Sequence, residues 1–95
     1  MAMMAQQRFE ASLNGIAKLK IEWKGLTPRH RVFASVTEVG PQDRPFIGDA
    51  RMTVHNVAPQ KDHALVWVEV ERDSPWRVFI DLMTVDPGAL KPPVF

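Results

Sequence analysis

Residues 17–24 alternate strictly between apolar and charged side chains, and this period of two constrains the fold more than any other feature. The apolar positions are Ala17, Leu19, Ile21 and Trp23, and the charged ones are Lys18, Lys20, Glu22 and Lys24. Successive side chains of a β-strand point to opposite faces, so one face of this segment is expected to be buried and the other solvated. Helical periodicity is weak throughout the chain.

Similar short segments rich in Val, Ile, Thr, Phe and Trp predict six strands, over residues 8–13, 17–24, 31–39, 46–56, 63–71 and 76–85. Turn residues separate them, and no helical crossover intervenes. We therefore expect an all-β chain whose antiparallel sheet folds into a β-sandwich or a small barrel of about six strands. Trp23 and Trp76 continue apolar alternations and are predicted to lie in the core.

Chain length favours a single domain. Two cores made from 95 residues, of which 45% are hydrophobic, would each be too small to hold. We expect residues 1–95 to form one β-sandwich domain, with an N-terminal arm over residues 1–7 and an extended, Pro-containing tail over residues 86–95.

Asn14-Gly15 separates the first two predicted strands and is typical of a β-hairpin turn. A two-residue loop would place Ala11 opposite Lys18, which mixes apolar and charged side chains on one face. A loop of three residues places Ala11 opposite Leu19 instead. The sequence therefore predicts a hairpin closed by residues 14–16, or a bulge beside the turn.

The last two predicted strands carry large apolar residues on the side that should face solvent. These residues are Leu65, Trp67, Phe79 and Met83. Three explanations stay open: the face is covered by the chain's own ends, it is an interface for a copy or another protein, or it is a ligand platform such as a surface for a sugar ring.

The short turn at residues 72–75 predicts that these two strands pair as a hairpin. Trp67 would then lie opposite Phe79, and Glu69 opposite Arg77. Pairing of the preceding strand would place Arg51 beside Trp67. The sequence thus predicts an aromatic and cation–π cluster bounded by an ion pair between Glu69 and Arg77.

Charge is unevenly distributed, although the formal net charge is only +1. Residues 1–31 carry six basic and two acidic side chains, a net of +4, and residues 32–95 carry a net of −3. Little aromatic interleaving accompanies the basic residues, which argues against nucleic acid as a partner. No apolar run is long enough to span a membrane and no secretory signal is recognisable, so we expect a cytoplasmic protein, with signal-independent export as the alternative.

The residues needed for the common catalytic sites do not occur together. The chain has no Cys, no nucleophile elbow and no phosphate-binding glycine loop. His55 and His63 flank one loop and are the nearest approach to a metal site, but their spacing matches no metal motif. Asp81 lies among apolar neighbours, and we expect it to pair with a base on the next strand, either Arg51 or Lys61. We therefore expect no catalytic residues and no cofactor.

Together these features predict a non-enzymatic protein that works through self-association or through binding another protein. The expected contacts are Leu65, Trp67, Phe79, Met83, Arg51 and Arg77, together with the two ends of the chain. The alternative is a small-molecule or carbohydrate-binding module that uses Trp67 and Arg51. A metal-dependent enzyme at His55 and His63 is a third and more distant hypothesis.

Overall fold

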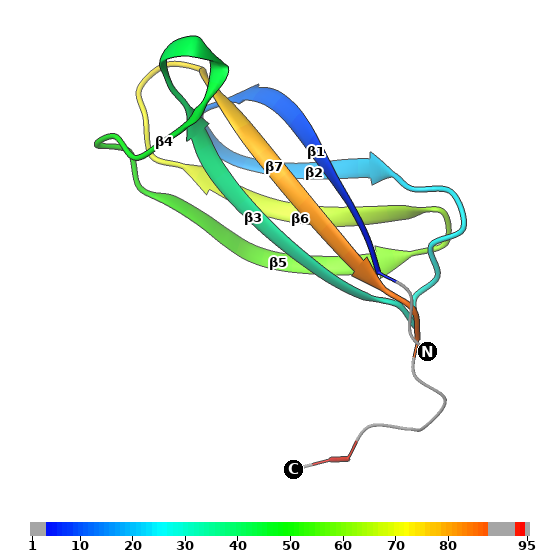
Figure 1. Ribbon diagram of the computed structural model, residues 1–95. Coiled ribbons are helices and arrows are strands. Elements are labelled where there is room, and N and C mark those ends of the chain that lie inside the picture. Colours follow the sequence, from blue (N-terminus) through cyan, green and yellow to red (C-terminus); the bar gives the residue numbers. More distant parts are fainter. Residues whose placement is uncertain (1–3, 88–92, 95) are drawn as a thin grey trace.

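The computed structural model describes residues 4–87 and 93–94, and its regular structure consists of strands and one short 3-10 turn (Figure 1). In chain order these are β1 (Met4–Leu13), β2 (Gly15–Glu22), β3 (Arg31–Val39), η1 (Pro41–Asp43), β4 (Pro45–Phe46), β5 (Met52–Gln60), β6 (His63–Val70) and β7 (Trp76–Val85). β3 and the last strand match their predicted bounds. The predicted strand over residues 46–56 is instead divided into the two-residue β4 and the longer β5.

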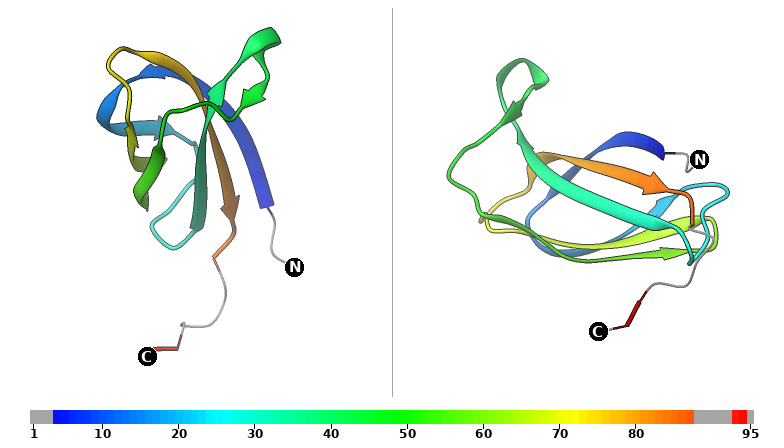
Figure 2. Two further views of the ribbon diagram at one scale, coloured as in Figure 1. Left: turned by 90° about the vertical axis from the view of Figure 1, so that its left-hand side faces the viewer. Right: turned by 60° about the horizontal axis from the view of Figure 1, so that its bottom comes forward.

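Two antiparallel sheets form the two layers of a sandwich, which confirms the predicted fold class. The first sheet has the order β1-β7-β3-β4 and the second the order β2-β6-β5. Figure 2 shows the layers from two further directions. β7 is the middle of the first sheet, because β1 pairs along one of its edges and β3 along the other. β6 has the corresponding place in the second sheet.

The core lies between these two middle strands. β6 contributes Ala64, Val66, Val68 and Val70, and β7 contributes Val78, Ile80 and Leu82, all of them buried. Both sets are every second residue of a strand, as the alternation predicts. Burying one Val or Leu side chain stabilises the fold by about 1.5–3 kcal/mol, so these two rows are the main apolar contribution to folding.

The turn at Asn14 does not close the predicted hairpin. β1 ends at Leu13 in one sheet and β2 begins at Gly15 in the other, so the chain crosses between layers at this point. Gly15 has a φ of 72°, a left-handed conformation that glycine adopts without steric strain. The prediction was wrong because an Asn-Gly pair specifies a sharp change of direction and not which strand becomes the neighbour.

The predicted pairing of the last two strands is wrong for a similar reason. β6 and β7 lie in different sheets, and residues 71–75 carry the chain from one layer to the other. Alternation determines which side chains of each strand face the core, and those assignments hold for both strands except at Trp76, the first residue of β7. It leaves open whether two successive strands are neighbours in one sheet or face each other across the core.

The connection after β2 closes one end of the sandwich. Leu26 is buried there, although it lies between two of the predicted strands and not within one. Its carbonyl accepts a hydrogen bond from the Asp62 N–H (2.9 Å), and the Trp23 N–H donates to the Asp62 carbonyl (3.0 Å). The Gly25 N–H donates to the Asp62 Oδ1 (2.9 Å). The connection is therefore attached to the β5–β6 turn.

The structure describes most of the expected N-terminal arm but little of the expected C-terminal tail. Residues 4–7 of the expected arm are part of β1, where Met4 pairs with Val85. Most of the expected tail, residues 88–92 and 95, lies outside the described residues, and so do residues 1–3.

Trp23 packs against the core, as predicted. In the described ranges, 4–87 and 93–94, no helix has the length and apolar character to cross a membrane.

Candidate functional site

The structure does not bring the predicted contact residues together. Leu65 and Trp67 point outward from β6, and Phe79 and Met83 point outward from β7. Because β6 and β7 belong to different layers, the two pairs lie on opposite outer faces of the sandwich. Three separate surfaces therefore have to be considered: the outer face of each sheet, and one end of the sandwich.

The outer face of the second sheet is centred on Trp67, whose residue is 38% exposed. Lys18 lies opposite Trp67 on β2, and its Nζ is 5.3 Å from the centre of the indole. His55 approaches from β5 on the other side, with its ring centre 4.8 Å from that of the indole. The indole is thus flanked by a cation from one neighbouring strand and an imidazole from the other.

A β-bulge in β5 explains why His55 reaches this position. The pairing register shifts between Val54, which faces Val68, and Asn56, which faces Trp67. His55 is the extra residue, and a bulge places two side chains opposite one on the partner strand. The Nε2 of His55 is 2.9 Å from the Glu69 Oε1, which fixes the imidazole beside the indole.

We call this surface the Trp67 face, and it consists of outward residues from the three strands of the second sheet. They are Ile16, Lys18, Lys20, Asn56, Ala58, Leu65 and Trp67. Leu65 is 43% exposed and lies opposite Lys20 and Ala58. A shallow hollow of about 380 Å³ runs between Lys18, Ala58, Leu65 and Trp67. The surface has an apolar centre and a basic border along β2.

Arg51 does not belong to this surface, contrary to the sequence-based register. Its carbonyl accepts a hydrogen bond from the Glu71 N–H (2.9 Å), beyond the first β5–β6 pair, Met52 with Val70. Trp67 faces Asn56, further along the same strand. The prediction failed because β5 runs on to Gln60 and turns tightly there, which shifts the register from the one expected with a longer loop.

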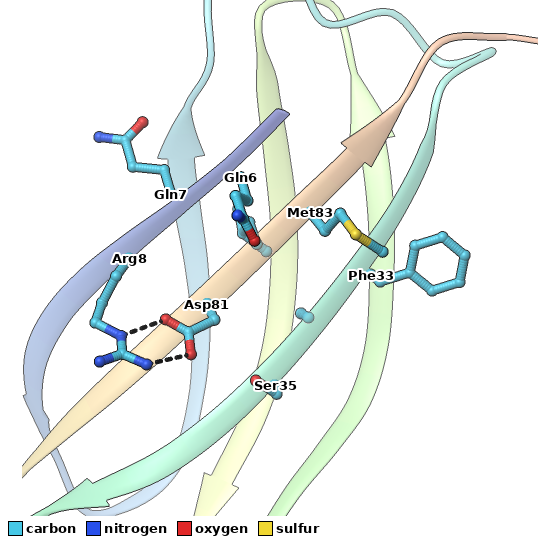
Figure 3. A pocket seen from close by; sticks show the side chains of 9 residues that line it. Gln6, Gln7, Arg8, Phe33, Ser35, Asp81 and Met83 are labelled. Atoms are coloured by element: carbon cyan, nitrogen blue, oxygen red, sulfur yellow. Dashed lines mark hydrogen bonds and ion pairs between the residues drawn. The ribbon is translucent and has the colours of Figure 1, made fainter. Parts of the chain in front are cut away.

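The outer face of the first sheet holds a second hollow, of about 460 Å³ (Figure 3). Arg8 and Asp81 face each other across β1 and β7, and the guanidinium donates two hydrogen bonds to the carboxylate, at 2.7 and 3.0 Å. Phe33 and Met83 form an apolar wall further along the hollow. Asp81 thus has a basic partner on a neighbouring strand, as expected, but the partner is Arg8 and neither Arg51 nor Lys61.

Phe79 is covered and is not an exposed contact residue. Only 8% of the residue is exposed, and the Arg8 guanidinium lies over the ring, 4.5 Å from its centre. Phe79 also lies between Glu10 of β1 and Thr37 of β3. The prediction of an exposed ring failed because β7 is a central strand, with neighbours on both sides whose side chains shield its outward residues.

Arg77 is held by two acids at the end of this face. It donates two hydrogen bonds of 3.0 Å to Glu10, and its Nη1 is 2.8 Å from the Asp43 Oδ1. The hydrogen bonds from Arg77 lower the pKa of Glu10, and those to Glu10 and Asp43 raise the pKa of Arg77. The predicted ion pair with Glu69 is wrong, since Glu69 lies in the other sheet and binds His55.

The third surface is a cleft at the start of β7, which we call the end cleft. It has a volume of about 610 Å³ and is lined by Ser12, Val39, Gly40, Pro41, Phe46, Pro75, Trp76 and Arg77. Trp76 was predicted to be core but is part-exposed here, with the Arg72 guanidinium 4.0 Å from its ring centre. It lies at the end of the strand, where the sandwich no longer encloses it.

The two histidines suggested as metal ligands do not form a site together. His63 pairs with Gln60 at the β5–β6 turn, and its Nδ1 is 3.0 Å from the Lys61 carbonyl oxygen. His55 lies on β5 and contacts Trp67, which is further along β6 than His63. In the part of the chain that the structure describes, no group of three or more His, Cys, Asp or Glu side chains could hold a metal ion.

Sequence reasoning missed the hollow beside Arg8 on the first sheet and the end cleft. A sequence signal existed for the first, since Asp81 lies among apolar neighbours in the sequence. Comparisons with protein-family models, curated proteins and solved structures found no match for the chain. Function therefore has to be argued from the geometry of these surfaces.

Proposed function

We propose that the chain is a non-enzymatic protein-interaction module and that the Trp67 face is its contact surface. The observation that carries the proposal is the exposure of Trp67 and Leu65 side by side on β6, the middle strand of its sheet. The inward residues of β6 are buried, so the side chains of these two residues lie outside the core. Exposed aromatic and aliphatic residues in the middle of a surface are typical of interface centres.

The border of the surface supports a protein partner of defined charge. Lys18 and Lys20 point outward from β2, directly opposite Trp67 and Leu65. Interfaces commonly combine an apolar centre with a charged rim that remains accessible to water. The partner is therefore expected to present an apolar patch bordered by acidic side chains, which would also speed association electrostatically.

A carbohydrate or small-molecule ligand is less well supported by the same surroundings. A stacking platform needs an open ring face, whereas Lys18 and His55 flank the indole on both sides. The expected second ligand group, Arg51, lies beyond the end of the β5–β6 ladder. The imidazole of His55 already has Glu69 as its partner. These contacts favour broad association of a surface over enclosure of a small ligand.

The proposal is tested by comparing proteins that bind the wild-type chain, Trp67→Glu and Phe33→Glu, with binding constants then measured for any purified partner. Phe33 is the matched control, since it is an exposed aromatic residue on the other outer face. We expect Trp67→Glu to weaken binding at least about tenfold and Phe33→Glu to leave it unchanged. Equal binding by both variants would contradict the proposal. Saturable quenching of the tryptophan fluorescence by a glycan, if it is absent in Trp67→Glu, would favour the carbohydrate alternative.

A further inference from the structure

The end cleft has the chemistry of a groove for an extended, proline-containing peptide. Phe46 forms one wall and is 45% exposed, and Trp76, whose ring has the Arg72 guanidinium 4.0 Å from its centre, forms another. Pro41 and Pro75 complete the apolar lining. Grooves lined by aromatic side chains recognise polyproline II segments, because proline rings pack flat against them and the indole N–H can donate to a peptide carbonyl.

The walls of the cleft are held in place before anything binds. A Cβ built on Gly40 would lie 2.5 Å from the Phe46 Cβ, so the phenylalanine rests directly on the glycine backbone. On the other side, Arg77 joins Glu10 of β1 to Asp43 of η1. A preformed groove binds a peptide with little loss of its own conformational freedom.

The chain itself contains a segment that matches this groove, the sequence Lys-Pro-Pro-Val-Phe at residues 91–95. Proline has a fixed φ and also favours an extended conformation in the residue before it, so such a sequence loses little entropy when bound. Within it, Pro93 is exposed, and Val94 is 87% exposed. An apolar side chain left so open gains most from a partner groove.

The segment as a whole cannot lie in the end cleft of its own chain. The cleft lies where β7 begins, at Trp76, whereas the segment follows the other end of that strand (Figure 1). A strand of this length spans about 30 Å. For the whole segment to lie in the cleft, residue 91 would have to reach it, and residues 86–91 extend to at most about 21 Å. A contact along the whole segment must therefore join two molecules.

We propose that the end cleft binds the proline-containing segment at residues 91–95 of a second copy of the chain. The contact is head-to-tail, since each copy presents the cleft at one end and the segment at the other. Such contacts close reciprocally in an antiparallel dimer, with each segment in the cleft of the other copy, or they generate rings or open chains of subunits. This site is separate from the Trp67 face, and it stands or falls independently of the proposed function.

The test is sedimentation of the full-length chain over a range of concentrations, together with two single variants. Phe46→Ala removes a wall of the cleft, and Val94→Asp places a charge in the bound segment. Each variant alone is expected to weaken association at least about tenfold. Ile47→Ala is the matched control, since Ile47 follows Phe46, is 94% exposed and does not line the cleft.

Mixing the two variants gives the sharpest result. Phe46→Ala retains the segment and Val94→Asp retains the cleft, so an equimolar mixture should form heterodimers but no longer assemblies. Wild-type protein that stays monomeric at about millimolar concentration would overturn the proposal, and so would variants that associate as the wild type does. Unchanged assembly of Trp67→Glu would show that the two surfaces act separately, which agrees with this proposal.

Discussion

The Arg8 guanidinium covers the Phe79 ring at 4.5 Å while it donates two hydrogen bonds to Asp81, two residues further along β7. One side chain thus removes an aromatic ring from solvent and neutralises a carboxylate on the same strand. A long side chain whose stem and planar head pack on apolar surface can stabilise a protein apart from its charge. This combination explains why the outer face of the first sheet is closed at Phe79 and open at Phe33.

Replacing Arg8 separates these two effects. We expect Arg8→Ala to lower the urea concentration at the unfolding midpoint, because Phe79 becomes exposed. Arg8→Met should retain more stability than Arg8→Ala, since its thioether chain can still cover the ring without a charge. Circular dichroism during urea unfolding measures the difference. If Arg8→Met is as unstable as Arg8→Ala, the ion pair and not the covering is the main effect.

Stability should depend on pH through Glu10. The hydrogen bonds from Arg77 lower the pKa of Glu10 from its ordinary value of 4.5. A carboxyl whose pKa is lower in the folded state contributes stability that is present above the unfolded pKa and is lost as the pH falls through the folded one. Between about pH 5 and pH 3, Glu10→Gln should therefore lose less stability than the wild type. Arg77→Gln, which removes the donor, should flatten the profile in the same way, and parallel profiles for all three proteins would contradict this account.

Gly15 should be sensitive to substitution for backbone reasons alone. Its φ is 72°, and an added Cβ would meet nothing within 4 Å. We therefore expect Gly15→Ala to reduce the free energy of unfolding by about 1–2 kcal/mol, the cost of a left-handed conformation. Gly15→Asn should cost less, since Asn tolerates this conformation better. Equal effects from Ala and Asn, measured by urea unfolding, would show that the backbone does not keep its left-handed turn.

Two leucines give a matched pair for the packing of the sandwich. Leu26 is buried at the end of the core and Leu65 is exposed on the Trp67 face. Leu26→Ala should reduce the free energy of unfolding by about 2–5 kcal/mol, through lost burial and a residual cavity. Leu65→Ala should change it by less than about 0.5 kcal/mol. Similar losses in the two variants would mean that Leu65 is covered in solution, as it would be in an oligomer.

The inward face of most strands could be predicted from the sequence, whereas the sheet to which each strand belongs and its neighbours there could not. Alternation places Val66 and Val78 toward the core, and both residues are buried. The same pattern is compatible with a hairpin or with a crossing between sheets, because inward side chains meet one core in either case. The crossing at Asn14 and the register shift at His55 depend on the final balance of packing over the whole sandwich.

The sequence predicts which side chains of a single strand point outward, but not which of them stay exposed once the strands are paired. Trp67 and Leu65 point outward as expected, and their exposure agrees with the alternation of β6. Phe79 has the same pattern on β7 but is covered, because Arg8 reaches it from a strand that was expected to pair elsewhere. The identity of adjacent strands therefore decides whether an outward aromatic residue is available to a partner.

The middle position of β7 has a consequence for how quickly the chain folds. The bond between Arg8 and Asp81 joins residues that are 73 positions apart in the chain. The first sheet can therefore form only after a long loop has closed, and chains dominated by such distant pairings usually need milliseconds to seconds to fold. Until β7 pairs with them, β1 and β3 have no neighbouring strand between them in the first sheet. We therefore expect folding to begin in the second sheet, where a tight turn joins β5 to β6.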